Sequence, residues 1–309
     1  MEIKKATRES YGEKLAELGE INKDIVVLDA DLSSATKTNI FAKKFPDRFF
    51  DVGISEQNLM GIAAGLSTFG KIPYVSTFAM FAAGRAYDQI RNSIAYPNLN
   101  VKICATHAGI TVGEDGATHQ MIEDISLMRT IPNMTVICTS DDTQTRWAVE
   151  EISKIKGPVY LRLCRLATPI IYNKEQDFEI GKMVQIGDGT DATIFATGVT
   201  VSEALKAKEI LKTKGIDIRV VDVCTIKPID NEMIIKCAKE TKKIITIEDH
   251  NIIGGLGSAI CEVLTQEYPC KVIRMGIQDQ FGRSGKAEEL MKYYKIDADS
   301  IVEKLLDEN

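Results

Sequence analysis

Several features that would place a sequence in a specialised class are scarce in this chain of 309 residues. The seven cysteines include no CxxC pair and lie mostly within apolar segments, so we expect reduced core residues and no bound metal. No apolar stretch reaches the roughly 18 residues that a membrane-spanning helix needs. The amino-terminal segment is charged throughout and lacks the apolar core of a secretory signal. We therefore expect a cytoplasmic protein with no membrane partner.

Basic side chains are also fewer than acidic ones. The 44 acidic side chains outnumber the 38 basic ones, which gives a net charge of -6, and no cluster of lysines and arginines could follow a phosphate backbone. We therefore expect no nucleic-acid partner, although a local cationic pocket for a small anion is compatible with this charge. What is present is ordinary: 44% hydrophobic and 27% charged residues are typical of a folded chain, and 309 residues at roughly 150 per domain predict two domains.

Short β-branched segments alternate with longer segments of helical periodicity, a pattern typical of βαβ units around a parallel sheet. In the first half we expect strands near residues 25–28, 48–52, 73–76, 101–106, 135–138 and 159–163, and helices near 56–69, 79–95, 120–130 and 142–155. In the second half we expect strands near 192–196, 217–222 and 243–248, and helices near 200–214, 231–240 and 257–267. Segment 168–191 is turn-rich and is interpreted as a linker, and residues 287–309 as a surface helix. The predicted fold class is α/β, with two parallel or mixed-sheet domains over residues 1–180 and 181–309.

Two of the three histidines flank one glycine-rich loop, THAGITVGEDGATHQ. The loop follows a predicted strand and precedes a predicted helix, which is where open α/β sheets bind ligands. A histidine beside a carboxylate can move protons at neutral pH, so His107, His119, Glu114 and Asp115 are candidate functional residues. The alternative is a polar surface loop whose acids act as caps. No third histidine or cysteine is near enough in sequence to predict a metal site.

One glutamate and two phenylalanines are further candidates. In GISEQN, Glu56 opens a predicted helix, so it either caps that helix or enters an apolar cleft and shares a proton with a ligand nitrogen. In STFAMF, Phe78 and Phe81 follow a strand and either belong to the core or wall a flat ring by stacking. Three arginines near strand ends or helix starts could bind phosphate or be ordinary surface residues: Arg8, Arg85 and Arg165.

Two glycine-rich segments resemble ligand-binding motifs but lack residues that those motifs require. GDG at 187–189 matches the first triplet of the motif that holds magnesium diphosphate in thiamine diphosphate enzymes, but the required downstream asparagine is missing. We interpret it as a turn into the first strand of the second domain. GGLGSA at 254–259 could bind an anion through its amides, but it lacks the GxGxxG spacing of a dinucleotide site.

A series of motifs occurs in the order found in the C-terminal half of transketolases: TRES, DADLSSA, GISEQN, STFAMF, THAGITVGEDGATHQ, RTIPNM, GPVYLRLCR, ATIFATG, VVDVCTIKPID and IEDHNIIGGLGSA. Over nearly its whole length the chain resembles the pyrimidine-binding domain and the C-terminal domain of that family, without the N-terminal half that binds diphosphate. It is thus similar to the smaller subunit of a split transketolase.

The resemblance implies a set of cofactor contacts. Glu56 matches the catalytic glutamate that hydrogen-bonds the aminopyrimidine ring nitrogen of thiamine diphosphate and promotes loss of the thiazolium C2 proton. Phe78 and Phe81 match the aromatic wall of the pyrimidine pocket, and Asp31 matches an aspartate beside the cofactor. Gly84 replaces a tyrosine of the family, which implies a more open pocket. Mg²⁺ or Ca²⁺ would be bound with the diphosphate through the partner subunit.

The resemblance also implies substrate contacts. Arg8, His107 and Arg165 match residues around the sugar phosphate. Asp115 and His119 match residues that contact substrate hydroxyls, and His119 would steer a proton on the sugar oxygen during catalysis.

The implied function is a thiamine diphosphate-dependent transketolase that transfers a two-carbon ketol unit from a ketose phosphate to an aldose phosphate. The chain would act with an N-terminal, diphosphate-binding subunit, as a homodimer within a heterotetramer. The preferred sugars are open, and so is phosphate contact near Ala35, where the family has a serine. The alternatives are a deoxyxylulose-phosphate synthase-like subunit, a 2-oxoacid dehydrogenase beta-like subunit and a non-catalytic interaction subunit. The intact set of candidate residues argues against the last of these.

Overall fold

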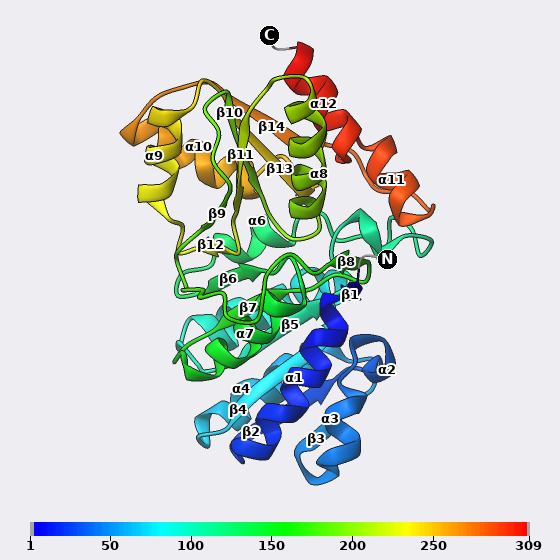
Figure 1. Ribbon diagram of the computed structural model, residues 1–309. Helices are drawn as coiled ribbons and strands as arrows, with labels where there is room; N and C mark the ends of the chain where they lie inside the picture. The colour runs from blue at the N-terminus through cyan, green and yellow to red at the C-terminus, as the bar shows by residue number, and fades with distance from the viewer. Residues whose placement is uncertain (1–2, 308–309) are drawn as a thin grey trace.

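The computed structural model describes residues 3–307 and contains two large β-sheets, each flanked by helices, and one two-stranded sheet (Figure 1). The small sheet pairs β1 (Lys4–Ala6) with β8 (Ala167–Pro169) in antiparallel orientation. The structure therefore confirms the predicted α/β class, with mixed rather than purely parallel sheets.

The larger sheet has seven strands and lies in the lower part of Figure 1. Its neighbours are parallel except for the edge strand β12, which is antiparallel to β6. In spatial order the strands are β12 (Thr225–Lys227), β6 (Thr135–Cys138), β7 (Val159–Arg162), β5 (Lys102–Thr106), β4 (Ile72–Phe78), β2 (Ile25–Asp29) and β3 (Phe49–Asp51).

Alternation of side chains along these strands divides the helices between the two faces. In β4, Tyr74 packs on the side of α1 (Thr7–Ile21) and α7 (Asp142–Lys154), whereas Val75 packs on the side of α4 (Glu56–Thr68) and α6 (Asp124–Arg129). Short segments complete this half of the chain: α2 (Ser33–Thr36), α3 (Asn39–Lys44), η1 (Pro46–Arg48), η2 (Met80–Arg85), α5 (Tyr87–Gln89), η3 (Ile90–Ala95) and η4 (Ile110–Val112).

The second large sheet has five strands and lies above the first in Figure 1. All of its pairs are parallel except that β9 runs antiparallel to β11. The spatial order is β14 (Val272–Ile277), β13 (Ile244–Asn251), β10 (Ala192–Ala196), β11 (Ile218–Asp222) and β9 (Val184–Ile186). Its helices are α8 (Thr200–Thr213), α9 (Asn231–Glu240), α10 (Leu256–Glu267), α11 (Ala287–Tyr293) and α12 (Ala298–Asp307).

The two sheets share an apolar core. One cluster of buried side chains continues from Leu59 of α4 through Met128 of α6 to Ile234 of α9 and Ile260 of α10. Strand β12 also comes from the second half of the chain but pairs with the first sheet. The two parts of the molecule are therefore tied together by both packing and strand pairing, and the predicted division near residue 180 stays a prediction.

Several expected elements differ from those in the structure. The helix expected over 79–95 is a succession of three short segments, two of them π-helical, whose hydrogen bonds span one residue more than those of an α-helix. The helix expected over 120–130 begins only at Asp124. GDG lies at a bend between β9 and β10, so it leads into the expected strand at 192–196 as predicted; that strand is second in chain order in this sheet because β9 was not predicted. Short strands of three to six residues were not predicted because they lack long apolar runs: β1, β8, β9, β12 and β14.

The carboxyl-terminal segment also differs from the expected surface helix. It forms α11 and α12, and both helices bury apolar side chains such as Leu290 and Ile301 against the second sheet. All seven cysteines are free; five are buried as expected, whereas Cys261 is half-buried and Cys270 is exposed. Within residues 3–307, no helix combines the length and the apolar character needed to cross a membrane.

Candidate active site

The candidate residues gather at the carboxyl ends of neighbouring strands β2, β4 and β5. Phe78 ends β4 and lies opposite Thr106, the last residue of β5, so His107 follows beside Phe78. Asp31 follows the end of the adjacent strand β2. Ligands bind at this edge in open α/β sheets, so the site has the position that the sequence predicts.

Four rings form a compact aromatic cluster at this edge. The Phe78 ring stacks on the imidazole of His107 with 3.8 Å between centroids and on the ring of Phe81 with 5.9 Å between centroids. The His119 ring stands edge-on to Phe81 at 5.4 Å. Phe78 is buried and Phe81 is half-buried, so the second phenylalanine offers part of its surface to a ligand. Such a wall suits a flat heteroaromatic ring.

Glu56 is the first residue of α4 and is 2% exposed, yet it does not act as a helix cap. No side chain caps α4, and the recorded partner of Glu56 within residues 3–307 is Arg85, whose Nη1 donates to Oε2 at 2.8 Å. The Arg85 guanidinium also lies over the Phe81 ring, 4.6 Å from its centroid. The structure therefore joins Glu56 to the aromatic cluster through an arginine whose side chain is 48% exposed.

His107 is held as a neutral imidazole. Burial, together with the positive charges of Arg8, Arg165, His119 and Lys37, lowers the pKa of His107 to about 3. Arg8 Nη1 lies 3.2 Å from His107 Nε2, and His107 Nδ1 lies 2.9 Å from Thr106 Oγ1. Because a guanidinium can only donate, Nε2 accepts and Nδ1 carries the proton that it donates to Thr106.

Arg8 has hydrogen-bonding capacity left over. Its Nη1 donates to the carbonyl of Ala35 at 2.9 Å, but its buried Nε has no hydrogen-bond partner. Burial lowers the pKa of Arg8, although the guanidinium stays charged. An unpaired donor on this half-buried cation favours an anionic ligand nearby.

The histidine loop places Asp115 beside Arg165 rather than beside His119. Arg165 Nη1 lies 3.3 Å from Asp115 Oδ2 and donates to the carbonyl of Val112 at 2.9 Å. His119 Nδ1 instead lies 3.0 Å from the hydroxyl of Thr118. The carboxylate partner that sequence reasoning offered to histidine is therefore bound to an arginine in this structure.

Asp31 and its neighbours form a polar corner of the site. Asp31 is exposed, has a left-handed backbone with φ of 62°, and its amide donates to Asp51 Oδ1 at 3.0 Å. Behind it, buried Asp29 accepts hydrogen bonds from Thr36 and Thr38, and burial raises the pKa of Asp29 to about 6. No contact recorded within residues 3–307 joins Asp31 to the aromatic cluster.

The amides of the GGLGSA segment do bind a carboxyl group, but that group belongs to the protein. Glu248 of β13 accepts hydrogen bonds from the amides of Leu256 and Gly257 at 2.7 and 2.8 Å. Burial raises the pKa of Glu248 to about 7. The amino terminus of α10 is therefore already satisfied and offers no free anion site.

Sequence reasoning missed several residues that organise the site. It did not predict the ion pair between Glu56 and Arg85, the contact between Thr106 and His107, or the role of Asp249. Asp249 accepts hydrogen bonds from the loop residues Ile110 and Thr111, which lie more than a hundred positions earlier in the chain. The available signal was the IEDHN segment at a strand end, but the pairing itself is not visible in the sequence.

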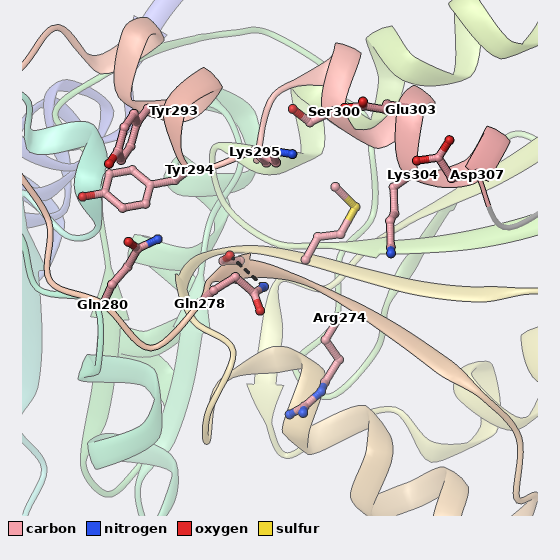
Figure 2. A pocket seen from close by; sticks show the side chains of 12 residues that line it. Arg274, Gln278, Gln280, Tyr293, Tyr294, Lys295, Ser300, Glu303, Lys304 and Asp307 are labelled. Carbon is pink, nitrogen blue, oxygen red and sulfur yellow. Dashed lines mark hydrogen bonds between the residues drawn. The ribbon is translucent and has the colours of Figure 1, made fainter.

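A separate hollow lies in the C-terminal part of the molecule, between β14 and helices α11 and α12 (Figure 2). Its volume is about 470 Å³, and it contains none of the predicted site residues. Arg274 points away from Lys295 and Lys304 in Figure 2, and its Nη1 donates to the carbonyl of Ile252 at 3.0 Å. The cationic groups of this hollow do not converge, so it lacks the chemistry of the strand-edge site.

The fold and site together define an α/β protein that carries, at a strand edge, an aromatic wall, a buried carboxylate and two arginines, Arg8 and Arg165, beside the histidine loop. Within residues 3–307, no group of three histidine, cysteine, aspartate or glutamate side chains is placed to hold a metal ion.

Comparison with known proteins identifies the family. Residues 3–170 match the transketolase pyrimidine-binding domain, and residues 181–301 match the transketolase C-terminal domain. A protein of Methanocaldococcus jannaschii described as a transketolase C-terminal section is 55% identical, over 99% of this chain and 97% of its own length. The transketolase of Rattus norvegicus is 41% identical over 96% of this chain, which spans 48% of that enzyme.

A solved structure agrees with the sequence relatives. The structure of a split gene transketolase, described as an inactive beta4 tetramer, is 50% identical, with a TM-score of 0.89 over 98% of this chain and 97% of its own. The chain belongs to the transketolase family, whose members are transferases that use thiamine diphosphate, and it corresponds to the C-terminal section of a split transketolase.

Proposed function

We propose that this chain is the pyrimidine-binding subunit of a two-chain transketolase that moves a two-carbon ketol unit between sugar phosphates. The observation that carries the proposal is the buried Glu56 carboxylate, which is bound to a half-exposed arginine and lies beside an aromatic wall. A carboxylate that serves only the fold would be saturated by internal donors, as Glu248 is. The family relationship favours this function over the synthase-like and dehydrogenase-like alternatives.

The residues present fit the pyrimidine half of thiamine diphosphate. Phe78 and Phe81 would stack against the aminopyrimidine, and Glu56 would hold a proton at its ring nitrogen. When bound, the cofactor supplies at its thiazolium C2 the nucleophile that attacks the ketose carbonyl. Asp31, at the end of the adjacent strand, is proposed to lie beside the same cofactor. Within residues 3–307, no group of three histidine, cysteine, aspartate or glutamate side chains is placed to hold the Mg²⁺ or Ca²⁺, and we assign this ion and the diphosphate to a partner subunit.

Arg8, His107 and Arg165 are proposed to bind the sugar phosphate. Arg8 keeps a buried, unpaired Nε, and Arg165 is 37% exposed, so both can donate to an anion. The neutral His107 adds no charge; it accepts from Arg8 and thereby orients the guanidinium. The low pKa of His107 keeps this contact in place, because a protonated His107 would repel Arg8.

His119 and Asp115 are proposed to contact the substrate hydroxyls. The His119 ring lies against Phe81, and its Nδ1 is engaged by Thr118, which leaves Nε2 to exchange a proton with a sugar oxygen. Asp115 is exposed and is shared with Arg165, so substrate binding can redistribute that ion pair.

The partner is proposed to be the N-terminal, diphosphate-binding section of a transketolase. This chain spans only 48% of the rat enzyme, and a split relative forms a tetramer of its beta chain that is described as inactive. We therefore propose a heterotetramer in which two copies of this chain pair with two copies of the partner.

The test compares the isolated chain with the chain reconstituted with its partner. Titration calorimetry should show weak binding of thiamine diphosphate to the isolated chain and tight binding to the complex. Ketol transfer should occur only in the complex. Tight cofactor binding and full turnover by the isolated chain would show that the two-subunit proposal is wrong.

A further inference from the structure

The loop that carries the substrate-side residues is held from the other half of the molecule. Asp249 lies in β13 of the second sheet and is 2% exposed. Its Oδ1 accepts from the amide of Ile110 at 2.8 Å, and its Oδ2 accepts from the Thr111 hydroxyl at 2.8 Å. These contacts fix the loop immediately after His107.

The approach between the two halves is unusually close at this point. Gly109 has φ of 79°, and a Cβ at this position would lie 2.1 Å from Asp249 Oδ2. Only glycine allows both that backbone conformation and that distance. The Asp249 carboxylate therefore packs directly against the backbone of the loop at Gly109.

Asp249 is itself held rigidly. Its carbonyl accepts from Arg162 Nη2 at 2.8 Å, and Arg162 Nε donates to Asp124 Oδ2 at the same distance. Arg162 and Asp124 are both buried, so this chain of contacts is shielded from water.

A second set of contacts holds the middle of the loop. Ser284 donates to the carbonyl of Glu114 at 2.7 Å, and Gln120 Nε2 donates to the carbonyl of Arg283 at 2.9 Å and to that of Gly113 at 3.0 Å. Figure 1 shows α11 beside this loop. The loop is thus held at both its start and its middle by the second half of the chain.

We propose that Asp249 is a positioning residue that, through Ile110 and Thr111, sets the placement of the loop bearing His107, Asp115 and His119. The C-terminal domain would then determine substrate binding without touching the substrate. The catalytic consequence rests on the proposed function, whereas the control of loop order does not.

The first test measures hydrogen–deuterium exchange of the loop amides in the full chain, without cofactor. In Asp249→Asn the single amide oxygen can accept from either the Ile110 amide or the Thr111 hydroxyl, but not from both in the wild-type geometry. We therefore expect amides of residues 108–120 to exchange about tenfold faster or more. The matched control is Asp222→Asn, because Asp222 is equally buried and bonds Ser140, Gln144 and Tyr172 but not the loop. Unchanged loop exchange in Asp249→Asn, or equal acceleration in Asp222→Asn, would overturn the proposal.

A milder variant keeps the test decisive if Asp249→Asn does not fold. Thr111→Val removes only the hydroxyl that donates to Asp249, and a smaller acceleration confined to the loop is expected. Wild-type exchange in Thr111→Val, when Asp249→Asn is unfolded, would count against a positioning role.

The second test uses the complex with the partner and thiamine diphosphate. In Asp249→Asn, or in Thr111→Val if the first variant does not fold, the KM for a ketose phosphate should rise, while proton exchange at cofactor C2 stays at the wild-type level, because Glu56 is not on the loop. Loss of C2 exchange with an unchanged KM would overturn the positioning role. A wild-type complex without C2 exchange would refute the proposed function and leave the amide-exchange result to decide the role of Asp249.

Discussion

Two buried glutamates have their carboxyl groups near the start of a helix, and they differ in which groups hydrogen-bond to them. Glu56 is the first residue of α4, whereas Glu248 belongs to β13 and faces the start of α10. Glu248 accepts from two backbone amides at the start of α10, and burial shields it completely. Glu56 begins α4 but accepts instead from Arg85, a half-exposed side chain that can move. Both carboxyl groups therefore lie near a helix start, but only Glu56 keeps the capacity to accept further hydrogen bonds from a ligand.

Two arginines three positions apart repeat the contrast. Arg162 is buried and donates to Asp124 and to the carbonyl of Asp249. Arg165 is 37% exposed and faces the histidine loop. The junction between the two halves thus uses its polar groups internally, whereas the strand edge keeps polar groups that a ligand can engage.

The largest expected effect is that of Glu56→Gln in the complex. The amide keeps the shape but cannot hold the proton at the ring nitrogen, so exchange at cofactor C2 should slow by roughly 10²–10⁴. The measurement is deuterium exchange at C2, read by NMR after an acid quench. Normal exchange and turnover in this variant would show that Glu56 takes no part in the mechanism and that, like Glu248, it has a structural role only.

Arg165→Ala should act on substrate rather than on cofactor. Loss of a charge-assisted contact costs about 1.5–3 kcal/mol, so the KM for a phosphorylated ketose should rise by roughly ten- to a hundredfold. The KM for an unphosphorylated sugar serves as the control and should change little. Equal effects on both sugars would indicate that Arg165, like Arg162, is structural.

Glu248→Gln should lower stability and leave C2 exchange unchanged. Burial raises the pKa of Glu248 to about 7 from 4.5, so between these values the folded chain keeps a proton that the unfolded chain has lost. The wild-type contribution to stability therefore falls as pH rises from about 4.5 to about 7. Thermal unfolding should show the variant less stable by about 1.5–3 kcal/mol near pH 4.5. Above pH 7 this difference should disappear or reverse, because the wild type loses roughly 3 kcal/mol over this range. A constant difference over this range would contradict the protonation of Glu248 in the fold.

Arg85→Gln should have the smallest effect. The ion pair with Glu56 is half-exposed on the arginine side, so its loss should change unfolding free energy by at most about 1 kcal/mol. C2 exchange in the complex should stay within about tenfold of wild type. A loss as large as that of Glu56→Gln would make Arg85 part of the catalytic machinery.

Much of the strand edge could be predicted because its signals are local. Phe78 ends one β-branched strand, His107 follows another, and Glu56 begins an apolar helical segment, so their common edge follows from the βαβ pattern. The roles assigned to Arg8, Arg165 and Asp31 came from the family resemblance and stay predictions. The π-helical segments after Phe78 were missed because helical periodicity does not reveal an inserted residue.

The sequence by itself determined the two α/β sheets, the family and the set of side chains at the strand edge, because these depend on local periodicity and on short motifs. Only the tertiary structure decided which polar groups are already satisfied. Asp249 accepts from a loop amide 139 positions earlier in the chain, and Arg162 donates to the carbonyl of Asp249, 87 positions later. Hydrogen-bond satisfaction depends on such contacts between distant segments, and no local pattern encodes them.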